Sequence, residues 1–593
     1  MGIDFDTELE FPPDDTGYGF DTIGDVLSVS PLLLEKYMRA AENIVERAVP
    51  AAARVVPERV LAGRDFVRAK DDGSGGDGGP RSAERMSFYE PARVEHSVDV
   101  AIAGDYRLAL EVHVDGGFEF DPCRSRVTFS VDGQERLREE YIWYDDRTFR
   151  YELAETWEPG THQLAFELES LCDPEKRTEK LDFQVLAVAI RGPLDERHWV
   201  RPERYDLFFP GGGPPDAEVE RRAYLRSLLA QFAGRAFRRP VDEALLDRLV
   251  AIAEREASRP DTTFERAVSR AMVAILSSPR FLFRIEGDAP TRPGEEHLHP
   301  LIDEHSLASR LSYFLWSTMP DAELFQSAAR GELRANLSAQ VKRMLADPRS
   351  DAFVRNFTGQ WLQARDVEHV SIDPIAALGF QSRWEELLAN FRGRRRRAPD
   401  QERTPEEEAE LAEFRRLAGL REKLNPALRE AMRRETELVF DHIVREDRSV
   451  LELLDSDYTF VNEALAEHYG IPGVEGTEMR RVTLPENSPR GGILTQGTFL
   501  VVTSNPTRTS PVKRGLFVLD NILGTPAPPP PSAVPELEES AAAIRDHEPT
   551  LREILEAHRS DALCSSCHSR FDPLGLALEN FNALGMWRDD EKG

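Results

Sequence analysis

Two cysteines and a histidine near the C-terminal end carry the clearest chemistry in this sequence. Cys564 and Cys567 are separated by two serines, and His568 follows directly. In a C-x-x-C-H run the two thiols can add to the vinyl groups of a haem, and the adjacent imidazole can ligate its iron. The spacing therefore predicts a covalent haem c at Cys564, Cys567 and His568.

Three other interpretations of this run stay open. The cysteine pair could be a redox dithiol, although no strand–helix alternation flanks it and His568 would then have no role. It could be half of a zinc site, but the chain has no second C-x-x-C pair, and His547 and His558 lack zinc-ligand spacing. A pattern of five residues also arises by chance.

The residues that follow are expected to orient His568 and to complete the iron coordination. The carbonyl groups of Asp572 and Pro573 are candidate acceptors for the second ring nitrogen of the histidine. Met586, after a predicted helix over 576–581, is the candidate sixth ligand, and a thioether there would raise the reduction potential. The alternatives are that Met586 packs in a core, that the ligand lies elsewhere, or that the iron is five-coordinate.

A basic cluster lies upstream of the cysteine pair in an otherwise acidic protein. Arg508, Lys513 and Arg514 are candidate partners for haem propionates, because guanidinium and ammonium groups form strong charge-assisted bonds with carboxylates. Salt bridges between a loop and a helix are the alternative. No Ser-His-Asp order, phosphate-binding loop or dinucleotide fingerprint offers a competing catalytic site.

Length and charge limit the classes of function. The chain has 593 residues, 40% of them hydrophobic, and a formal net charge of −31. These values predict several folded domains and argue against binding to nucleic acid or to anionic membranes, which requires a basic face. Because no run of 18 apolar residues occurs, we expect no membrane span.

Residues 89–193 show the alternation of apolar and polar residues that is typical of strands. Turn signals separate the runs, so the segment is predicted to form an antiparallel β-sandwich. Cys123 and Cys172 both fall within it and are predicted to form a disulfide, with two buried thiols as the alternative.

The sandwich also carries candidate ligand-binding residues. Asp115 and Asp121 are candidate calcium ligands on an acidic loop, and Trp143 and Trp157 could stack on sugar rings. Solvated loops and core packing are the alternative assignments. A sandwich within a helical protein is commonly a binding module, which suggests docking on a polysaccharide.

The rest of the chain is predicted to be helical, so the fold class is mainly α and multidomain, with one inserted antiparallel β-sandwich and a short C-terminal cytochrome c-like segment. The predicted divisions are a helical module over 1–62, a flexible linker over 63–88, the sandwich over 89–193, helical modules over 194–290 and 291–390, a charged insertion over 391–423, a helical module with a Gly- and Thr-rich loop over 424–525, a polyproline connector over 526–535 and the haem segment over 536–593.

Several long strings in this order resemble the planctomycete-type multidomain cytochrome c proteins, which are modular exported bacterial proteins, mostly of unknown function. The strings are F-P-P-D-D-T-G-Y-G-F-D, R-A-F-R-R-P, L-A-S-R-L-S-Y-F-L-W-S-T-M-P-D, D-Y-T-F-V-N-E-A-L-A-E-H-Y-G, R-G-G-I-L-T-Q-G with T-S-N-P-T-R-T-S-P-V-K-R-G, and C-S-S-C-H with D-P-L-G-L-A-L-E-N-F. The segment over 89–193 is similar to the calcium-dependent, carbohydrate-binding sandwich of some members.

The resemblance implies a haem protein of the periplasm or cell surface, truncated at both ends, with its export signal expected upstream of Met1. Three functions follow from it. The chain could be an electron-transfer protein with a redox partner protein and a glycan-docking sandwich. It could be a non-redox scaffold or a carbohydrate-binding surface protein. It could also be a haem-dependent oxidoreductase acting on a polysaccharide. The family does not supply a reaction.

Overall fold

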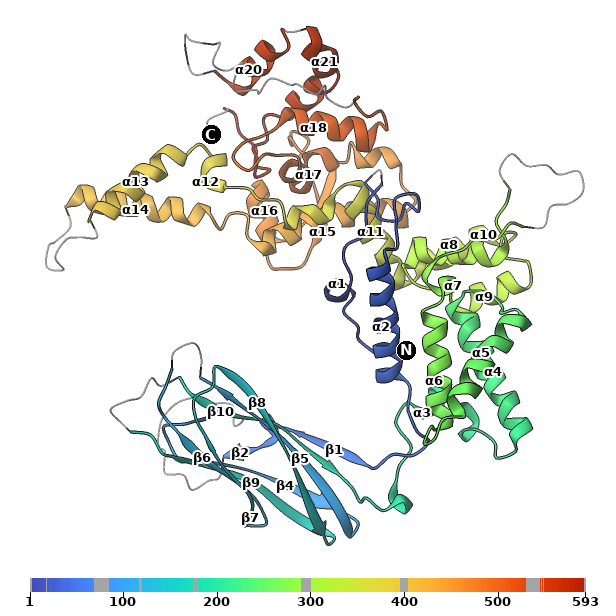
Figure 1. The fold of residues 1–593 in the computed structure, drawn as a ribbon. Helices are drawn as coiled ribbons and strands as arrows, with labels where there is room; N and C mark the ends of the chain where they lie inside the picture. Colours follow the sequence, from blue (N-terminus) through green and yellow to red (C-terminus); the bar gives the residue numbers. More distant parts are fainter. Residues whose placement is uncertain are drawn as a thin grey trace, which may run out of the picture. The chain divides into compact units, whose positions relative to one another are not determined.

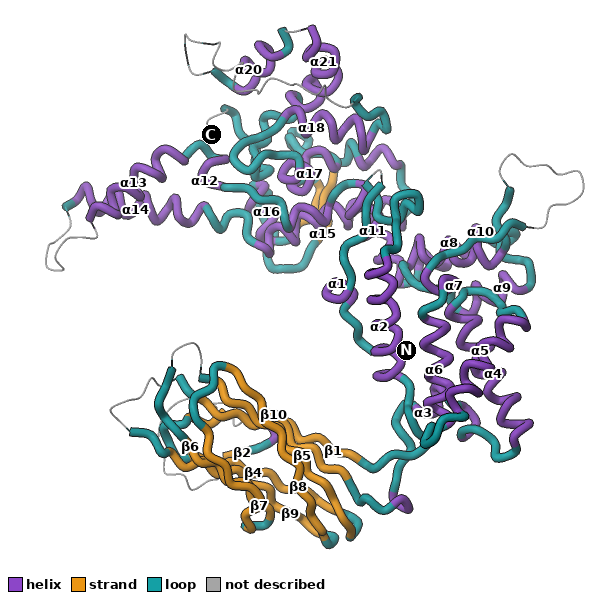
Figure 2. The backbone as a smooth tube through the Cα atoms, in the orientation of Figure 1, coloured by secondary structure: helices purple, strands orange, loops and turns teal. Residues whose placement is uncertain are grey.

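The computed structural model describes residues 3–17, 19–68, 85–116, 120–173, 180–289, 300–394, 404–528, 544, 547, 549–560 and 562–590. The chain divides into two units, Met1–Glu10 with Glu35–Leu282, and Phe11–Leu34 with Phe283–Gly593. Figure 2 shows most of the strands gathered in one part of the chain, and helices with a short pair of strands in the remainder. The chain is therefore mainly helical with one β-rich domain.

The β-rich domain of the first unit is an antiparallel sandwich, as predicted. One sheet has the order β1-β10-β5-β8, with β3 also paired to β10, and the other has the order β2-β4-β9-β6-β7. Alternate residues of the long strands β5 and β6 point into the shared core, and those of β6 are buried at every second position. The strands are β1 (Glu58–Ala62), β2 (Val67–Arg68), β3 (Arg85–Ser87), β4 (Ala92–Val100), β5 (Gly104–Asp115), β6 (Ser125–Val131), β7 (Gln134–Tyr141), β8 (Asp146–Trp157), β9 (Gly160–Ser170) and β10 (Asp182–Arg191).

The sandwich begins earlier in the chain than predicted. Strand β1 pairs with β10 from Glu58↔Arg191 to Ala62↔Ala187, and β2 pairs with β4. These segments fall in the predicted helical module over 1–62 and the predicted linker over 63–88, whose Gly-rich part over 71–80 lies outside the described residues. Strand β1 is only five residues long, which is too short for its alternation to stand out in the sequence.

The helices of the first unit surround a second core. The apolar stripe of α2 (Pro31–Ala48) packs in a cluster with α4 (Glu218–Ala236), α5 (Glu243–Ala257) and α6 (Phe264–Leu276). Asp242 caps α5, because its carboxylate accepts a hydrogen bond from the Leu245 N–H at 2.8 Å. The shorter helices of the chain up to residue 282 are α1 (Thr7–Glu10), α3 (Tyr205–Phe208) and α7 (Pro279–Leu282).

The second unit is built from helices and one two-stranded sheet (Figure 1). Asp303 and Asp321 cap α8 and α9 through their carboxylates. The elements are α8 (Glu304–Trp316), α9 (Ala322–Ala329), α10 (Leu337–Ala346), α11 (Asp351–Trp361), α12 (Pro374–Ala377), α13 (Gln381–Arg394), α14 (Pro405–Leu420), α15 (Pro426–Arg445), β11 (Tyr458–Val461), α16 (Glu463–Tyr469), β12 (Arg480–Thr483), α17 (Gly497–Val502), α18 (Pro511–Phe517), α20 (Leu551–His558) and α21 (Ala562–Leu576). None of the helices within the described ranges is long and apolar enough to cross a membrane.

The charged insertion contains a helix with an apolar face. Helix α14 packs against α13, and the rings of Phe414 and Trp384 stack with centroids 4.7 Å apart. Leu387 and Leu417 are fully buried beside them. The arginine run begins at the end of α13, and residues 395–403 lie outside the described residues. Despite its many charged residues, this segment therefore forms a small apolar core between α13 and α14.

Candidate functional site

Helix α21 carries both cysteines and the histidine of the C-x-x-C-H run. Cys564 and Cys567 are free thiols, both partly exposed. Residues three and four apart lie on one helix face, so Cys567 and His568 follow Cys564 by one turn on the same side. The helix ends at Leu576, where the sequence had predicted a helix over 576–581 to begin, and it passes through Pro573. The three residues are thus held by one rigid element.

The carboxylate of Asp572 orients the ring of His568. The Nδ1 atom of His568 lies 3.0 and 3.2 Å from the two carboxylate oxygens of Asp572, one turn further along α21. The predicted acceptors were the backbone carbonyls of Asp572 and Pro573, so the group was misassigned although the residue was right. Helix geometry explains the difference, because a carboxylate at i+4 reaches the side chain at i. With Nδ1 held as donor, the Nε2 lone pair is free to ligate a metal ion.

Three further side chains surround this pair. Asp572 is fully buried, and Nε of Arg559 lies 3.6 Å from its carboxylate. The ring centroid of His568 lies 4.9 Å from that of His558 in α20 and 4.7 Å from that of Phe571. Burial raises the pKa of the Asp572 carboxyl, and the charges of His568, Arg559 and His558 oppose that shift. Sequence reasoning missed Arg559 and His558, whose positions depend on how α20 and α21 pack.

Helix α21 crosses α18 at a contact made of glycines. A Cβ on Gly515 of α18 would lie 2.0 Å from the carbonyl oxygen of Phe571, and one on Gly575 would lie 1.8 Å from that of Pro511. A side chain at either position would clash with backbone. The segment that carries the C-x-x-C-H run is therefore packed directly on α18, which belongs to the predicted module with the Gly- and Thr-rich loop and precedes the predicted polyproline connector. Residues 529–535 of that connector lie outside the described residues.

Arg514 holds the end of α21 in place. Its Nη1 donates to the carbonyls of Leu578 and Phe581 at 2.7 and 2.9 Å, and its Nη2 donates to that of Asn582 at 3.2 Å. The side chain is fully buried, and burial lowers its pKa to about 10. A propionate role was predicted for Arg514, but its guanidinium is occupied by these protein carbonyls and by Glu579.

The other predicted haem contacts are Lys513, Arg508 and Met586, and each lies in a different environment. Lys513 donates from Nζ to the Ser504 carbonyl at 3.3 Å, and Arg508 is partly exposed in the preceding loop. Met586 packs against an apolar cluster formed by α15, α16 and α17 together with Leu584. This contact corresponds to the packing alternative for Met586 and leaves the sixth-ligand assignment without structural support.

A buried polar network anchors the chain that follows α21. Glu435 of α15 accepts hydrogen bonds from Thr459 Oγ1 at 2.5 Å and Tyr469 Oη at 2.6 Å. The guanidinium of Arg490 lies over the ring of Tyr469, 3.6 Å from its centroid, and donates to the Gly585 carbonyl at 2.7 Å. His468 Nε2 lies 2.8 Å from the Leu584 carbonyl oxygen. Burial raises the pKa of Glu435 to about 7 and lowers that of His468 to about 4.

The sandwich residues are divided between core and surface. A disulfide joins Cys123 and Cys172, whose Cα atoms are 4.7 Å apart. Asp121 is buried and accepts from Tyr89 Oη at 2.5 Å and Cys123 N–H at 2.7 Å. This carboxylate serves the protein core, and the described residues contain no group of three acidic, His or Cys side chains that would hold a metal ion. The calcium prediction for Asp115 and Asp121 is therefore unsupported within the described residues.

Of the two tryptophans proposed to face sugars, only one lies near an exposed aromatic residue. Trp157 is buried and stacks on His162, so it belongs to the core. Trp143 is partly buried, and Phe120, which is 69% exposed, contacts it edge-on with centroids 5.5 Å apart. Phe120 and Trp143 are thus the aromatic pair of the sandwich that can reach a ligand.

The site and the fold define a modular helical protein with an inserted sandwich and a C-terminal C-x-x-C-H helix. Four family models match it, each described as a protein of unknown function: PSD3 (DUF1587) over residues 1–50, PSD5 (DUF1595) over 224–286, PSD4 (DUF1592) over 302–471 and PSCyt3 (DUF1588) over 490–591. The chain belongs to the planctomycete-type multidomain cytochrome c family, as its motifs predicted. PSCyt3 spans both α18 and α21, which agrees with their direct packing.

Comparisons outside the family add little. No curated protein matches the chain. Among solved structures, the chain is similar to the CBM36-1 domain of a multidomain xylanase from the hindgut metagenome of Trinervitermes trinervoides (11% identity, 23% of this chain, 98% of that chain, TM-score 0.17). It is also similar to a carbohydrate binding module of Cellvibrio mixtus lichenase 5A in complex with cellotriose (12% identity, 23% of this chain, 98% of that chain, TM-score 0.14). Because both TM-scores are far below 0.5, these likenesses carry no argument about a ligand.

Proposed function

We propose that this chain is a c-type cytochrome, with Cys564 and Cys567 as the attachment thiols and His568 as an axial ligand. The observation that carries the proposal is the bond between His568 Nδ1 and the Asp572 carboxylate, on a helix that also presents two free thiols one turn apart. An orienting carboxylate on the second nitrogen is the usual companion of a metal-ligating histidine. A histidine with a purely structural role would not need free cysteines at this spacing.

The proposed role is electron transfer in the periplasm or at the cell surface. A bound haem would supply a one-electron redox couple. Within the chain, the two thiols would fix its position, Asp572 would set the ring orientation of His568, and Arg514 would hold α21 against α18. Export is supported by the disulfide in the sandwich, because such bonds persist in oxidising compartments.

Expression with an export signal and a haem-attachment system tests this proposal. Purified protein should carry one haem that stays attached after denaturation, with the α band of a thioether-linked haem in its pyridine complex. The double variant Cys564→Ala/Cys567→Ala should lose it, whereas Ser565→Ala/Ser566→Ala in the same turn should retain it. A wild-type protein that folds without covalent haem would contradict the proposal.

A haem-dependent oxidoreductase is the second candidate, because Met586, the candidate sixth ligand, packs against an apolar cluster. An open sixth position would let small ligands reach the iron. Binding of carbon monoxide to the reduced protein, seen as a shift of the Soret band, would favour this function over simple electron transfer. An unchanged spectrum would favour a six-coordinate electron carrier.

We further propose that the sandwich docks on a polysaccharide through Phe120 and Trp143. An exposed aromatic ring beside a second aromatic residue offers the apolar surface on which sugar rings stack. Phe120→Ala should reduce retention in affinity electrophoresis through polysaccharide gels, and Val60→Ala, an exposed residue of β1, should not. Equal migration of wild-type protein in gels with and without each polysaccharide would contradict this docking role.

A further inference from the structure

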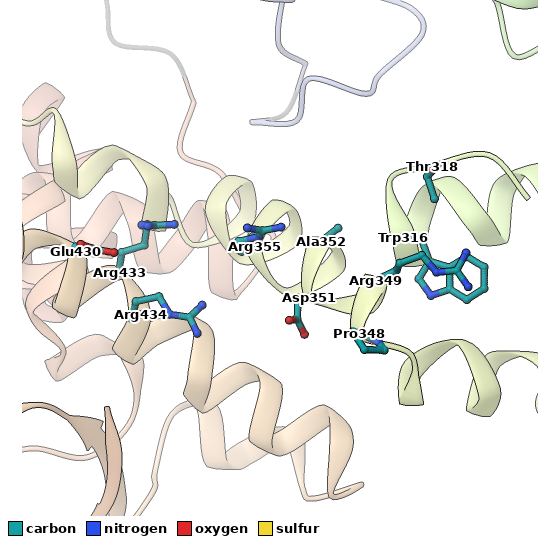
Figure 3. A pocket seen from close by; sticks show the side chains of 10 residues that line it. All are labelled: Trp316, Thr318, Pro348, Arg349, Asp351, Ala352, Arg355, Glu430, Arg433 and Arg434. Carbon is teal, nitrogen blue, oxygen red and sulfur yellow. The ribbon is translucent and has the colours of Figure 1, made fainter. Parts of the chain in front are cut away.

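An arginine-lined cleft in the second unit is separate from every residue assigned above. Its volume is about 740 Å³, and its walls come from the end of α8, the start of α11 and one face of α15 (Figure 3). Four arginines line it, at positions 349, 355, 433 and 434, together with the carboxylates of Asp351 and Glu430. Arginine is the side chain best suited to bind carboxylate and phosphate groups, because its planar fork matches them.

Three of the four arginines are held in place by the protein. Arg349 lies over the ring of Trp316, 3.6 Å from its centroid, and pairs with Asp347 at 2.8 Å. Arg433 pairs with Glu368 at 2.7 Å and with Glu437 at 3.1 Å, and Arg434 pairs with Glu437 at 2.5 Å. These contacts balance the charges and use part of the five N–H donors of each guanidinium. The remaining donors are thus presented on fixed side chains.

Arg355 differs from the other three. It is exposed on α11 and forms no hydrogen bond or ion pair with any residue that the structure describes. In the view of Figure 3 its side chain lies between those of Arg433 and Arg349. Asp351, on the same helix, is paired with Arg445 at 2.7 Å, away from Arg355. Among the described residues, the cleft therefore contains one guanidinium without an ion pair, beside three that are already oriented.

We propose that this cleft binds a small ligand with at least two oxyanion groups, carboxylate or phosphate, and that Arg355 is its principal contact. Fixed arginines lower the ordering cost of binding, and the unpaired Arg355 contributes a new charge-assisted bond. The rim carboxylate of Glu430, which has no partner within the described ranges, opposes an anion and limits its affinity. The site does not depend on haem.

Isothermal titration of the full chain with pyrophosphate and with citrate, each at constant ionic strength, tests the proposal. At least one probe should bind saturably with one site per chain, and the probe that binds tells whether phosphate or carboxylate is preferred. Arg355→Gln should raise Kd by at least about tenfold, because a charge-assisted hydrogen bond contributes about 1.5–3 kcal/mol. Glu430→Gln should lower Kd, because it removes a repulsive charge.

Arg415→Gln is the matched control. Arg415 is also exposed on a helix of the second unit, α14, without an ion pair among the described residues, and lies outside the cleft lining. This variant should bind as the wild type does. Since Arg355 has no partner to lose, Arg355→Gln should keep the circular dichroism and melting temperature of the wild type. Absence of saturable binding of both probes, or equal affinity in wild type and Arg355→Gln, would overturn the proposal.

Discussion

Gly515 of α18 packs against the backbone of Phe571 in α21, so closely that a Cβ on the glycine would lie 2.0 Å from the Phe571 carbonyl oxygen. Phe571 directly precedes Asp572, the residue that orients His568. The glycine in the R-T-S-P-V-K-R-G string thereby sets how closely α18 approaches α21, the helix that carries the C-x-x-C-H run. Two motifs that lie far apart in the sequence form one interface.

Gly515→Ala should destabilise this interface strongly. The added methyl group would overlap a backbone carbonyl that cannot move without displacing α21, and overpacking of this kind costs about 1–3 kcal/mol or more. Urea unfolding should show a lower midpoint. Gly419→Ala is the control, since Gly419 lies in helix α14 with no atom within 4 Å of its added Cβ, and it should be neutral or slightly stabilising. Equal midpoints for both variants would contradict the close crossing.

Arg514→Met should also lower the free energy of unfolding of the C-terminal module. The substitution keeps much of the apolar volume, but the buried carbonyl of Phe581 loses its donor, whereas the carbonyls of Leu578 and Asn582 still accept from the N–H groups of Phe581 and Gly585. One unsatisfied buried group costs about 1–3 kcal/mol, so the free energy of unfolding should fall by about that amount. Arg415→Met, at an exposed position, should change it by less than about 0.5 kcal/mol. If Arg514→Met had the same free energy of unfolding as the wild type, the hydrogen bonds of Arg514 would not stabilise this module.

The sequence was informative where the signal is local. The period-two alternation within 89–193 predicted the sandwich, and local chemistry of the same kind places Asp242, Asp303 and Asp321 at helix starts, where each carboxylate accepts from the N–H three residues on. These features depend on neighbours within a few residues. They could therefore be predicted without knowledge of tertiary packing.

The less successful predictions concern long-range packing. Arg514 was a candidate partner for a haem propionate, and the approach of the carbonyls after α21, which explains its burial, has no local signal in the sequence. The predicted helix over 576–581 began too late: α21 ends at Leu576 and continues through Pro573, although proline lacks an N–H, where it packs against α18. The side-chain bond between Asp572 and His568 was not predicted, because the backbone carbonyls of Asp572 and Pro573 were taken as the acceptors. Recognising H-x-x-x-D as an i, i+4 pair would have found it.

Asp572→Asn tests the role of the carboxylate at the candidate haem site. The amide has the same shape but is a weaker acceptor than a carboxylate, so less electron density reaches the iron through His568, and the oxidised haem is stabilised less. Haem should still attach, and a spectroelectrochemical titration should give a more positive reduction potential than that of wild type. Asp589→Asn, an exposed residue, should leave it unchanged. Identical potentials in all three proteins would show that Asp572 does not act on the iron.

Glu435 should make the stability of the second unit fall as pH rises. Its carboxyl is buried between Thr459 and Tyr469, and desolvation raises its pKa from 4.5 in the unfolded chain to about 7. A folded pKa above the unfolded value means that folding takes up a proton, so this stabilisation is complete below about pH 4.5 and is lost as pH rises through about 7. A shift of this size corresponds to a loss of about 3 kcal/mol.

Urea unfolding at intervals between pH 4.5 and 8 measures this dependence. Glu435→Gln keeps the hydrogen bonds available to a neutral side chain and has no proton to lose, so its stability relative to wild type should increase across that range. Glu430→Gln removes a carboxylate from the same helix at an exposed position and should follow the wild-type profile. If Glu435→Gln and wild type keep a constant difference from pH 4.5 to 8, Glu435 is charged throughout, and Arg490 must then compensate its burial.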